Sequence, residues 1–302
     1  MSSKGVVFLA IGHPHYVSMA GNCAAGVKIN NPDIKITLIT EESVINTVDA
    51  SYKNQFDNIV YINSKYYNIG NKNHWGRAKL SLYNIVTQST DLDEALFIDA
   101  DSLLGINCNI DNIFNTIAPY DFWISNYETL PIAAGTGNIG HWADLSAFIN
   151  TIEFKSEVIP TSIQSSLIYF KRNETIKQYF DDALEIHDNI VNGGITYNNR
   201  WFGAVPDELC FSLSYAKNDL PLHPHNSILY SIYRSVKPSE YSDLVNSAHI
   251  ITFSTGTNTI SMTALQLYNN LTAYYARKRG IRFIWQWKDK VAFNKLNIIR
   301  RS

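Results

Sequence analysis

Apolar runs of strand length alternate with helix-length segments through the first hundred residues of the chain. Continuous apolar runs indicate strands that are buried on both faces, and longer segments with apolar or small residues on one side indicate helices. The predicted strands are 5–11, 33–40, 58–62 and 94–98, and the predicted helices are 16–29, 43–54 and 75–87. Strands and helices that alternate in this way predict an α/β fold with a parallel sheet and right-handed crossovers.

The pattern becomes irregular after residue 101. We predict strands at 121–125, 165–170 and 248–253, helices at 175–187, 208–216 and 261–279, and a glycine-rich loop at 126–141. Neither an internal repeat nor a low-complexity linker divides the chain. We therefore predict one continuous domain over 1–260, with halves at 1–105 and 106–260, followed by a C-terminal helix and tail over 261–302.

Composition narrows the class of protein. With 302 residues and 45% hydrophobic content, the chain can bury a substantial core. No apolar stretch reaches the ~18 residues that span a bilayer, and the start lacks the pattern of a signal peptide. Cys23, Cys108 and Cys210 are odd in number and widely spaced, which indicates reduced thiols and a cytoplasmic location. No cysteine spacing suggests zinc.

Charge is concentrated at the C-terminus. Residues 277–302 hold nine Lys or Arg against one acid, whereas residues 1–276 hold 16 basic and 26 acidic residues. Four aromatic residues lie among these charges: Phe283, Trp285, Trp287 and Phe293. Such a tail suits an anionic polymer or an anionic membrane surface. The alternative is a terminal segment whose aromatic side chains pack on the acidic body.

The most informative motif follows the predicted strand 94–98. The chain leaves this buried strand through Asp99-Ala100-Asp101, so two carboxylates can approach one divalent cation. Oxygen ligands suit Mg²⁺ or Mn²⁺, and these ions usually keep positions open for phosphate oxygens. The carboxyl edge of an α/β sheet is also where ligands tend to bind. An ordinary acidic turn would have the same residues.

These features together resemble a known family. The segment 76–80 (Gly-Arg-Ala-Lys-Leu), a helix, the strand 94–98 and Asp99-Ala100-Asp101 are similar to metal-dependent glycosyltransferases of the GT-A fold, in particular the glycogenin and lipopolysaccharide galactosyltransferase group of retaining enzymes. The resemblance implies a Rossmann-like mixed sheet flanked by helices. It makes 1–105 the nucleotide-sugar-binding half and 106–260 the acceptor half.

The resemblance also implies roles for individual residues. Tyr16 would stack on the uracil of a UDP-sugar, Lys79 would contact the donor, and His249 would complete the metal site. The implied donor-binding residues are Ala10, Gly12, Tyr16, Arg77, Lys79, Asp99, Ala100 and Ser165; the metal ligands, for Mn²⁺ or Mg²⁺, are Asp99, Asp101 and His249; and the catalytic residues are Gln164, Asp207 and Glu208.

Each assignment has an alternative. Gln164 and Ser165 could be polar residues at a strand edge, and Asp207 and Glu208 could be acids at a helix N-terminus. His249 could be structural, because the chain lacks the family's Lys-Pro-Trp after it and continues as 252–257 (Thr-Phe-Ser-Thr-Gly-Thr).

Some aromatic residues and histidines near these motifs have weaker assignments. The residues Tyr66, Tyr67, His74 and Trp75 could cover a donor or form a packed loop. The loop histidines His13 and His15 are expected to be solvated.

The predicted function is sugar transfer from a nucleotide-sugar to a hydroxyl acceptor, with retention of the anomeric configuration. The alternative from another class is a catalytically silent protein of the same fold that binds a glycan or a nucleotide. A nucleotidyltransferase would need a Gly- and Arg-rich loop after the first strand, which is absent. The acceptor could be a hydroxymethylated base in DNA or a surface polysaccharide, and the net charge of −2 disfavours tight duplex binding.

Overall fold

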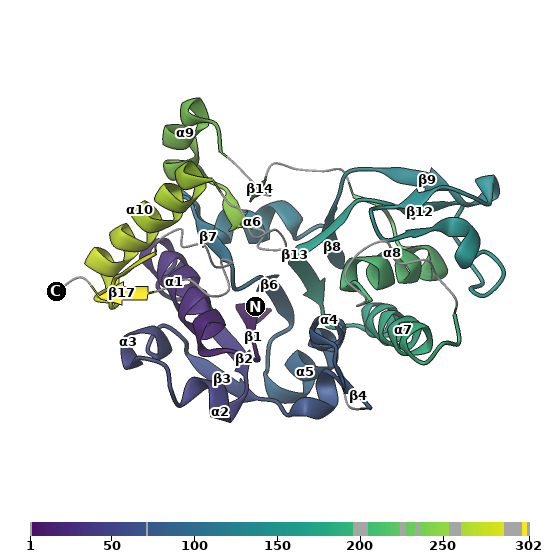
Figure 1. Cartoon of the computed structure of the whole chain (residues 1–302), viewed down its shortest axis with the longest axis horizontal. Coiled ribbons are helices and arrows are strands. Elements are labelled where there is room, and N and C mark those ends of the chain that lie inside the picture. Colours follow the sequence, from purple (N-terminus) through teal and green to yellow (C-terminus); the bar gives the residue numbers. More distant parts are fainter. Residues whose placement is uncertain are drawn as a thin grey trace. The chain divides into compact units, whose positions relative to one another are not determined.

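The structure is a computed structural model that describes residues 2–70, 72–195, 205–223, 228–232, 236–253, 261–286 and 298–300. The chain forms two compact units whose segments alternate along the sequence (Figure 1). The unit that we call the α1 unit comprises Lys4–Ile62, Leu96–Pro119 and Asn226–Ser302, and the unit that we call the α7 unit comprises Met1–Ser3, Asn63–Ala95 and Tyr120–His225.

The α1 unit begins with parallel strands, as the sequence predicts. The strands β1 (Lys4–Ala10), β2 (Lys35–Thr40) and β3 (Asn58–Tyr61) pair side by side, with Gly5 opposite Lys35 and Ala10 opposite Thr40. Three consecutive residues of β1, Val6 to Phe8, are fully buried. An uninterrupted apolar run is therefore buried on both faces here.

The connections between these strands are helical. The first connection is α1 (Pro14–Asn30), which confirms the helix predicted at 16–29. The prediction of one helix at 43–54 is wrong, because two short helices occur instead, α2 (Glu42–Ile45) and α3 (Ala50–Lys53). The side chain of Asp49 accepts a hydrogen bond from the backbone N–H of Ser51, and this cap starts a new helix at Ala50.

Small residues let two other helices approach α1 closely. A Cβ atom at Gly21 would lie 2.8 Å from the Cβ of Tyr52 on α3, and one at Gly26 would lie 3.0 Å from the ring of Tyr275. Tyr275 belongs to α10 (Met262–Arg279), which lies beside α1 (Figure 1). The helix predicted at 261–279 is thus confirmed. No helix in the described part of the chain is long and apolar enough to cross a membrane.

A second, smaller sheet lies within the α1 unit. Its strand order is β14 (Leu229–Ile232), β15 (Ile250–Phe253), β7 (Ser102–Leu104), with β15 parallel to β14 and antiparallel to β7. The remaining elements of the α1 unit are α6 (Ile110–Ile117), α9 (Tyr241–Val245), and the antiparallel strands β16 (Ile284–Gln286) and β17 (Ile298–Arg300). The rest of the basic tail, residues 287–297 and 301–302, lies outside the described residues.

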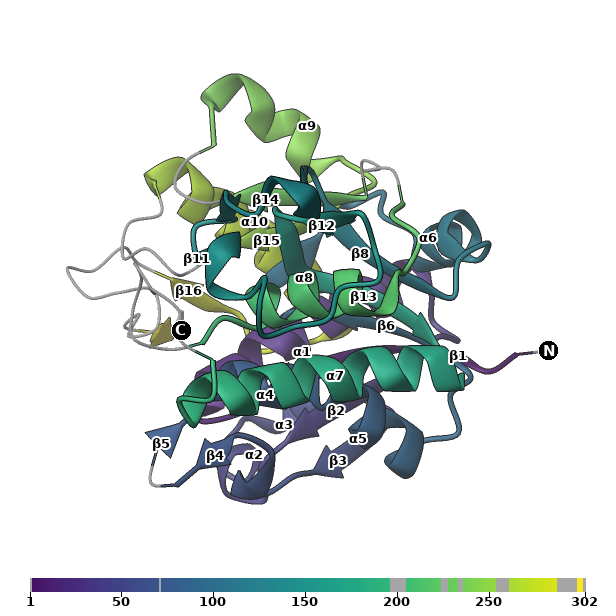
Figure 2. The same cartoon turned by 90° about the vertical axis from the view of Figure 1, so that its right-hand side faces the viewer.

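The α7 unit is built on an antiparallel strand pair and two long helices. The strand β13 (Ile163–Lys171) pairs with β8 (Phe122–Asn126), and their register shifts between Gln164 and Ile168. The helix α7 (Glu174–Val191) packs on α8 (Asp207–Asn218) and on α4 (Trp75–Leu80), as Figure 2 shows. The helix α5 (Leu82–Ser89) follows α4. The short strands are β4 (Asn68–Ile69), β5 (Lys72–Asn73), β9 (Thr129–Pro131), β10 (Asn138–Ile139), β11 (Ala143–Asp144) and β12 (Val158–Pro160).

The strand β6 (Glu94–Ile98) belongs to both units, and all five of its residues are buried. The largest sheet is mixed and has the order β3-β2-β1-β6-β13-β8. The bounds of β6 are those predicted from the apolar run, so the strand ends directly before Asp99. This ending positions the candidate site.

Candidate functional site

The two aspartates lie in a tight turn of the α1 unit. The carbonyl of Asp99 accepts a hydrogen bond from the backbone N–H of Ser102 at 3.0 Å, and the carbonyl of Asp101 accepts one from Phe253 at 3.0 Å. Both aspartates are half-buried, whereas Ala100 between them is 7% exposed. The turn is therefore closed by its own backbone and held against the end of β15.

The segment that follows the turn is anchored by α1 and α10. The hydroxyl of Tyr275 is hydrogen-bonded to both the N–H and the carbonyl of Leu104 in β7. The side-chain amide of Asn30 donates to the carbonyls of Ile106 and Cys108 at 2.9 and 2.7 Å. Since these contacts bind the backbone, they hold the segment after Asp101 in place whatever its side chains are.

The loop from β1 to α1 carries three of the predicted donor-binding residues. The carbonyl of Ala10 accepts a hydrogen bond from the Thr40 hydroxyl at 2.6 Å, so it serves to hold β1 to β2. Gly12 has a positive φ of 79° and its N–H donates to Glu41 at 2.6 Å. Burial raises the pKa of the Tyr16 phenol and the charge of Asp101 raises it further. The phenol of Tyr16 and the carboxylate of Asp101 therefore interact electrostatically.

His15 is a candidate that the sequence did not indicate. The sequence predicts a solvated side chain, but His15, in the first turn of α1, is only 6% exposed. Burial, together with nearby His13, lowers its pKa to about 4, so the imidazole is neutral near pH 7. Its Nε2 atom is buried and has no hydrogen-bond partner. A buried polar atom of this kind is costly unless a ligand or water satisfies it, and no local sequence pattern reveals such burial.

The structure does not bring His249 to the aspartates. The carbonyl of His249 accepts from the N–H of Gly105, whereas Asp101 pairs with Phe253 at the other end of β15. Four residues of extended chain separate these two ends, roughly 13 Å. No group of three or more His, Cys, Asp or Glu side chains placed to hold a metal ion occurs among the described residues. β15 begins after the histidine and not before it, and a role for His249 as third ligand stays a prediction.

The aspartate pair still fits a hard cation by its donor chemistry. Two carboxylates supply oxygen ligands in a turn that is partly open to solvent, and Mg²⁺ or Mn²⁺ is commonly held by one or two carboxylates together with water and phosphate oxygens. Asp99 and Asp101 would thus supply two oxygen ligands to such an ion.

In the α7 unit the structure brings together three of the predicted residues. The ammonium of Lys79 lies 3.2 Å from the Ser165 hydroxyl, which donates to Asp207 at 2.7 Å. Lys79 and Asp207 also form an ion pair at 3.4 Å, with side chains 14% and 17% exposed. These residues come from α4, β13 and the first turn of α8. We call Lys79, Ser165 and Asp207 the polar triad.

Two further predicted residues adjoin the polar triad in sequence. Gln164 is 9% exposed, and its side-chain carbonyl accepts a hydrogen bond from the hydroxyl of Tyr127 at 2.9 Å. Glu208 follows Asp207 in the first turn of α8 and is half-buried. The register shift of β13 begins at Gln164, and such irregularities commonly re-aim side chains beside functional sites.

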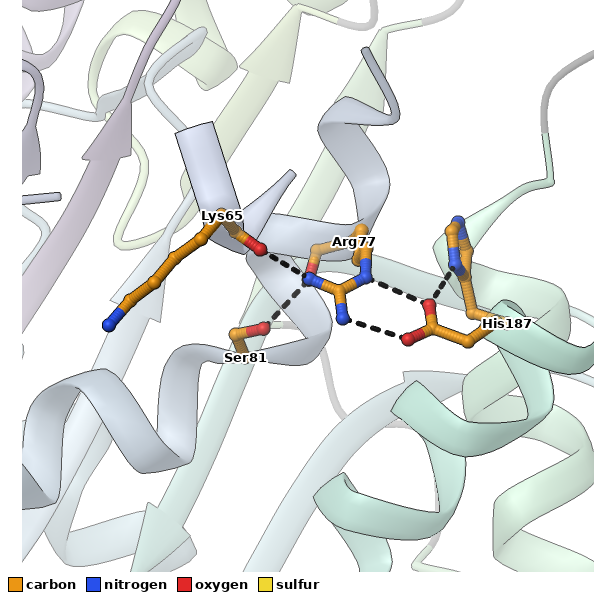
Figure 3. Close-up of polar contacts among 5 residues, drawn as sticks. Lys65, Arg77, Ser81 and His187 are labelled. Carbon is orange, nitrogen blue, oxygen red and sulfur yellow. Dashed lines mark hydrogen bonds and ion pairs between the residues drawn. The ribbon is translucent and has the colours of Figure 1, made fainter. Parts of the chain in front are cut away.

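Arg77 has a structural role that the sequence did not predict. Its guanidinium makes two hydrogen bonds of 2.8 Å to Asp188 on α7 and one of 2.9 Å to the carbonyl of Lys65 (Figure 3). The Nδ1 atom of His187 contacts the same carboxylate at 3.1 Å. The guanidinium of Arg77 thus joins α4 to α7 in this structure, and its role in donor binding stays a prediction.

Comparisons with known proteins agree with this geometry at the level of the fold. Comparison of the sequence with family models and with curated proteins finds no match. The chain is similar in structure to mouse xyloside xylosyltransferase 1 in its apo form, with a TM-score of 0.50 and 10% identity, over 83% of this chain and 97% of that one. It is also similar to the apo form of WbbM, a bifunctional glycosyltransferase, with a TM-score of 0.54 and 10% identity over 92% of this chain.

That match covers 52% of WbbM, so this chain spans about half its length. An active-site mutant of LgtC, a galactosyltransferase, matches with a TM-score of 0.50 and 13% identity over 91% of this chain and 99% of that one. Similarity at these identities concerns the backbone arrangement. The chain has the GT-A glycosyltransferase fold.

Proposed function

We propose that this protein is a metal-dependent glycosyltransferase that moves a sugar from a nucleotide-sugar, with UDP as the nucleotide, to a hydroxyl acceptor. The observation that carries the proposal is the Asp99-Ala100-Asp101 turn at the end of β6. A fold alone does not define a function, but a carboxylate pair at this edge of such a sheet is suited to a metal-bound diphosphate.

Asp99 and Asp101 would hold Mn²⁺ or Mg²⁺. The bound cation would neutralise negative charge on the departing diphosphate, which is how metals assist such reactions. Tyr16 and His15 lie at the start of α1, and the charge of Asp101 raises the pKa of Tyr16. We propose that Tyr16 stacks on the base and that the Nε2 atom of His15 hydrogen-bonds to the nucleotide, which would satisfy its buried polar atom.

The polar triad would act on carbohydrate. Ser165 and Lys79 hold the Asp207 carboxylate in one orientation, so Asp207 would accept hydrogen bonds from sugar hydroxyls and orient them. Gln164 and Glu208 would add polar contacts beside it. Because Asp207 is already paired with Lys79, it is suited to orientation more than to removing a proton. This favours the retaining course, in which an oxygen of the donor phosphate takes the proton of the acceptor.

The alternative function is a catalytically silent protein of the same fold. The position of His249, away from Asp101, and the absence of a lysine after β15 both favour it. Such a protein would bind a glycan or a nucleotide, whereas the acceptor of a glycosyltransferase would be a hydroxymethylated base in DNA or a surface polysaccharide. The cytoplasmic location and the membrane contact through the tail are predictions from composition.

The experiment that tests the proposal uses the full chain with Mn²⁺ and UDP. We expect UDP with Mn²⁺ to raise the melting temperature of the wild type, because a ligand of the native state at 100 times its Kd adds about 2.7 kcal/mol. Asp99→Asn and Asp101→Asn should abolish this shift and lower the release of UDP from UDP-sugars at least about 100-fold. Asp33→Asn, which changes an exposed carboxylate of the α1 unit, is the matched control and should behave as wild type.

Two results would decide against the proposal. Absence of any metal-dependent shift with UDP, across Mn²⁺ and Mg²⁺, would exclude the carboxylate pair as the diphosphate site. A normal shift without release of UDP from UDP-glucose, UDP-galactose, UDP-xylose or the corresponding N-acetylhexosamine donors would support the silent alternative.

A further inference from the structure

Two histidines of the α7 unit have buried ring nitrogens without a hydrogen-bond partner among the described residues. They are His74, directly before α4, and His187, near the end of α7. The atom concerned is Nε2 in both rings. His187 is 0% exposed and His74 is half-buried. A buried polar atom is costly unless it has a partner, so two such atoms on neighbouring rings point to a ligand that both can bind.

The spacing of the two rings fits a shared metal ion. Their centroids are 5.5 Å apart and their planes are inclined by 86°. A Zn–N bond of about 2.0–2.1 Å places the centre of an imidazole ring about 3.2 Å from the ion. Two imidazoles on one tetrahedral ion therefore have centroids about 5.2 Å apart. The observed distance is within a few tenths of an ångström of this value.

Asp188 fixes the proton of His187 in the form that a metal requires. The Nδ1 atom of His187 lies 3.1 Å from the Asp188 carboxylate, which also accepts two hydrogen bonds from Arg77 (Figure 3). A carboxylate only accepts hydrogen bonds, so Nδ1 carries the proton, and Nε2 of the neutral ring has the lone pair. Histidines that bind metals almost always donate their other N–H to a carboxylate, a carbonyl or water. His187 is therefore oriented as a ligand.

His74 is held beside α7 by its backbone. Its N–H donates to the carbonyl of Tyr67 at 2.6 Å, and its carbonyl accepts from the N–H of Arg77 at 3.0 Å. It occupies the N-cap position of α4, but its side chain makes no capping hydrogen bond. The ring contacts His187 instead, and α4 itself packs on α7. Both imidazoles thus belong to elements that are already in contact.

We propose that His74 and His187 bind a Zn²⁺ ion through their Nε2 atoms, with water at the remaining positions. Imidazole nitrogen suits Zn²⁺, whereas carboxylate oxygen suits Mg²⁺ and Mn²⁺, so this site differs in chemistry from the aspartate pair. The ion would join the start of α4 to α7, beside the contact of Arg77 with Asp188. Since the described side chains supply two ligands, and structural zinc sites have four, we expect the ion to exchange. The proposal does not depend on the glycosyltransferase function.

The charges around the two histidines allow a cation to bind. The segments of the α7 unit contain ten Lys or Arg and sixteen Asp or Glu, a net charge of −6. The positive groups that act on His74 are Lys72 and Arg77. Lys72 is exposed, so salt and solvent screen its charge, and Arg77 is paired with Asp188 at 2.8 Å. Neither therefore opposes the ion strongly.

The test uses the full chain without an affinity tag, treated with a chelator and then titrated with Zn²⁺ alone. We expect calorimetry to detect Zn²⁺ binding and the ion to raise the melting temperature, because it binds the native state. His74→Gln and His187→Gln should each weaken this binding at least about tenfold, and Asp188→Asn about tenfold through its contact with His187. Bound Co²⁺ should give a visible absorption band that both glutamine variants lose.

Two controls separate this site from other ligands of the chain. His141→Gln changes an exposed histidine of the same unit, and Asp101→Asn changes the aspartate pair; both should bind Zn²⁺ at these histidines as the wild type does. The half-buried His74 provides a variant that should fold even if His187→Gln does not.

The proposal is supported if Zn²⁺ binding is lost in His74→Gln and kept in both controls. It is overturned if the wild type does not bind Zn²⁺, if His74→Gln binds it as tightly as the wild type, or if the loss follows His141→Gln or Asp101→Asn. A variant that lowers only the metal-free melting temperature would show that the two rings pack on each other and hold no ion, which also overturns the proposal. UDP takes no part in these measurements, so failure of the proposed glycosyltransferase function would leave their outcome unchanged.

Discussion

Lys79 and Asp207 form an ion pair that is largely withdrawn from solvent, with side chains 14% and 17% exposed at a distance of 3.4 Å. Removing one partner leaves the other partly buried without its counter-charge. We therefore expect Lys79→Met and Asp207→Asn each to lower the free energy of unfolding by about 1–3 kcal/mol. The double variant should cost less than the sum, with a coupling of about 1–2 kcal/mol, measured by urea unfolding.

The matched control is another lysine–aspartate pair of the same unit. Lys177 and Asp181 lie one turn apart on α7 at 2.9 Å, with side chains 45% and 33% exposed. An exposed pair of this kind contributes about 0.3–0.5 kcal/mol. If Lys79→Met lowered the free energy of unfolding no more than Lys177→Met does, the Lys79–Asp207 pair would contribute no more to stability than an exposed ion pair.

Residue-level prediction from sequence worked where the evidence was local and failed where it depended on pairing. The apolar run before Asp99 determines where β6 ends, so the acidic turn could be located from the sequence alone. The position of His249 depends on the register of β15 against β7, about 150 residues away in sequence, and no local pattern encodes it. The burial of His15 is likewise a property of the packed unit.

For helices and strands, too, prediction worked where the sequence signal is local and failed where the element depends on contacts with distant residues. The strands β1, β2, β3 and β6 were predicted within two residues. The clearest case is β6, because a strand buried on both faces is a continuous apolar run. The predicted helix 75–87 is instead two helices that break at Ser81, where the side chain bonds to the carbonyl of Arg77. The three-residue strand β7 was missed, since its stability comes from pairing with β15 and from Tyr275.

The contact of Arg77 on α4 with Asp188 on α7 should make the stability of the protein depend on pH. Burial opposes ionisation of Asp188, but hydrogen bonds from His187 and Arg77 outweigh it and lower its pKa to about 2. An aspartate in the unfolded chain titrates near 3.9. A group whose pKa is lower in the folded state adds stability above its unfolded pKa, and this contribution is lost as the pH falls from about 4 to about 2.

We therefore expect Asp188→Asn to be less stable than the wild type at pH 5 and to approach it as the pH is lowered to 2. Urea midpoints at pH 5, 4, 3 and 2 measure this difference. Asp121→Asn is the control, because Asp121 pairs with Lys171 at 3.2 Å on the surface, with its side chain 64% exposed. If the difference in stability between wild type and Asp188→Asn stayed constant over this range, the Asp188 carboxylate would not be ionised in its contact with Arg77.

At the scale of the whole molecule, the charge of the chain is divided between its units. The segments of the α1 unit contain fifteen basic and eleven acidic residues, a net charge of +4, against −6 for the α7 unit. The basic excess comes from residues 277–302, which hold nine of the fifteen. The tail is thus the part of the chain that could bind an anionic surface. At least one of its positive charges, that of Arg282, already forms an ion pair within the chain.

Arg282, near the start of the tail, contacts the residues that begin α3. Its guanidinium pairs with Asp49 at 2.9 Å, its N–H donates to the Ser51 hydroxyl at 3.0 Å, and its carbonyl accepts from Tyr52 at 2.7 Å. These contacts tie the start of the tail to α3 and its cap. Hydrogen bonds of this kind contribute about 1 kcal/mol each and an exposed ion pair less.

We therefore expect deletion of residues 281–302 to lower the free energy of unfolding by about 2 kcal/mol, measured by urea unfolding of the full and the truncated chains. Arg282→Met removes the ion pair and keeps both backbone contacts, so it should cost under about 1 kcal/mol. Lys53→Met, at the last residue of α3, controls for the loss of one positive charge beside the same helix. Equal stability of the full and truncated chains would show that the tail does not hold α3, and its charge would then be available in full to an anionic surface.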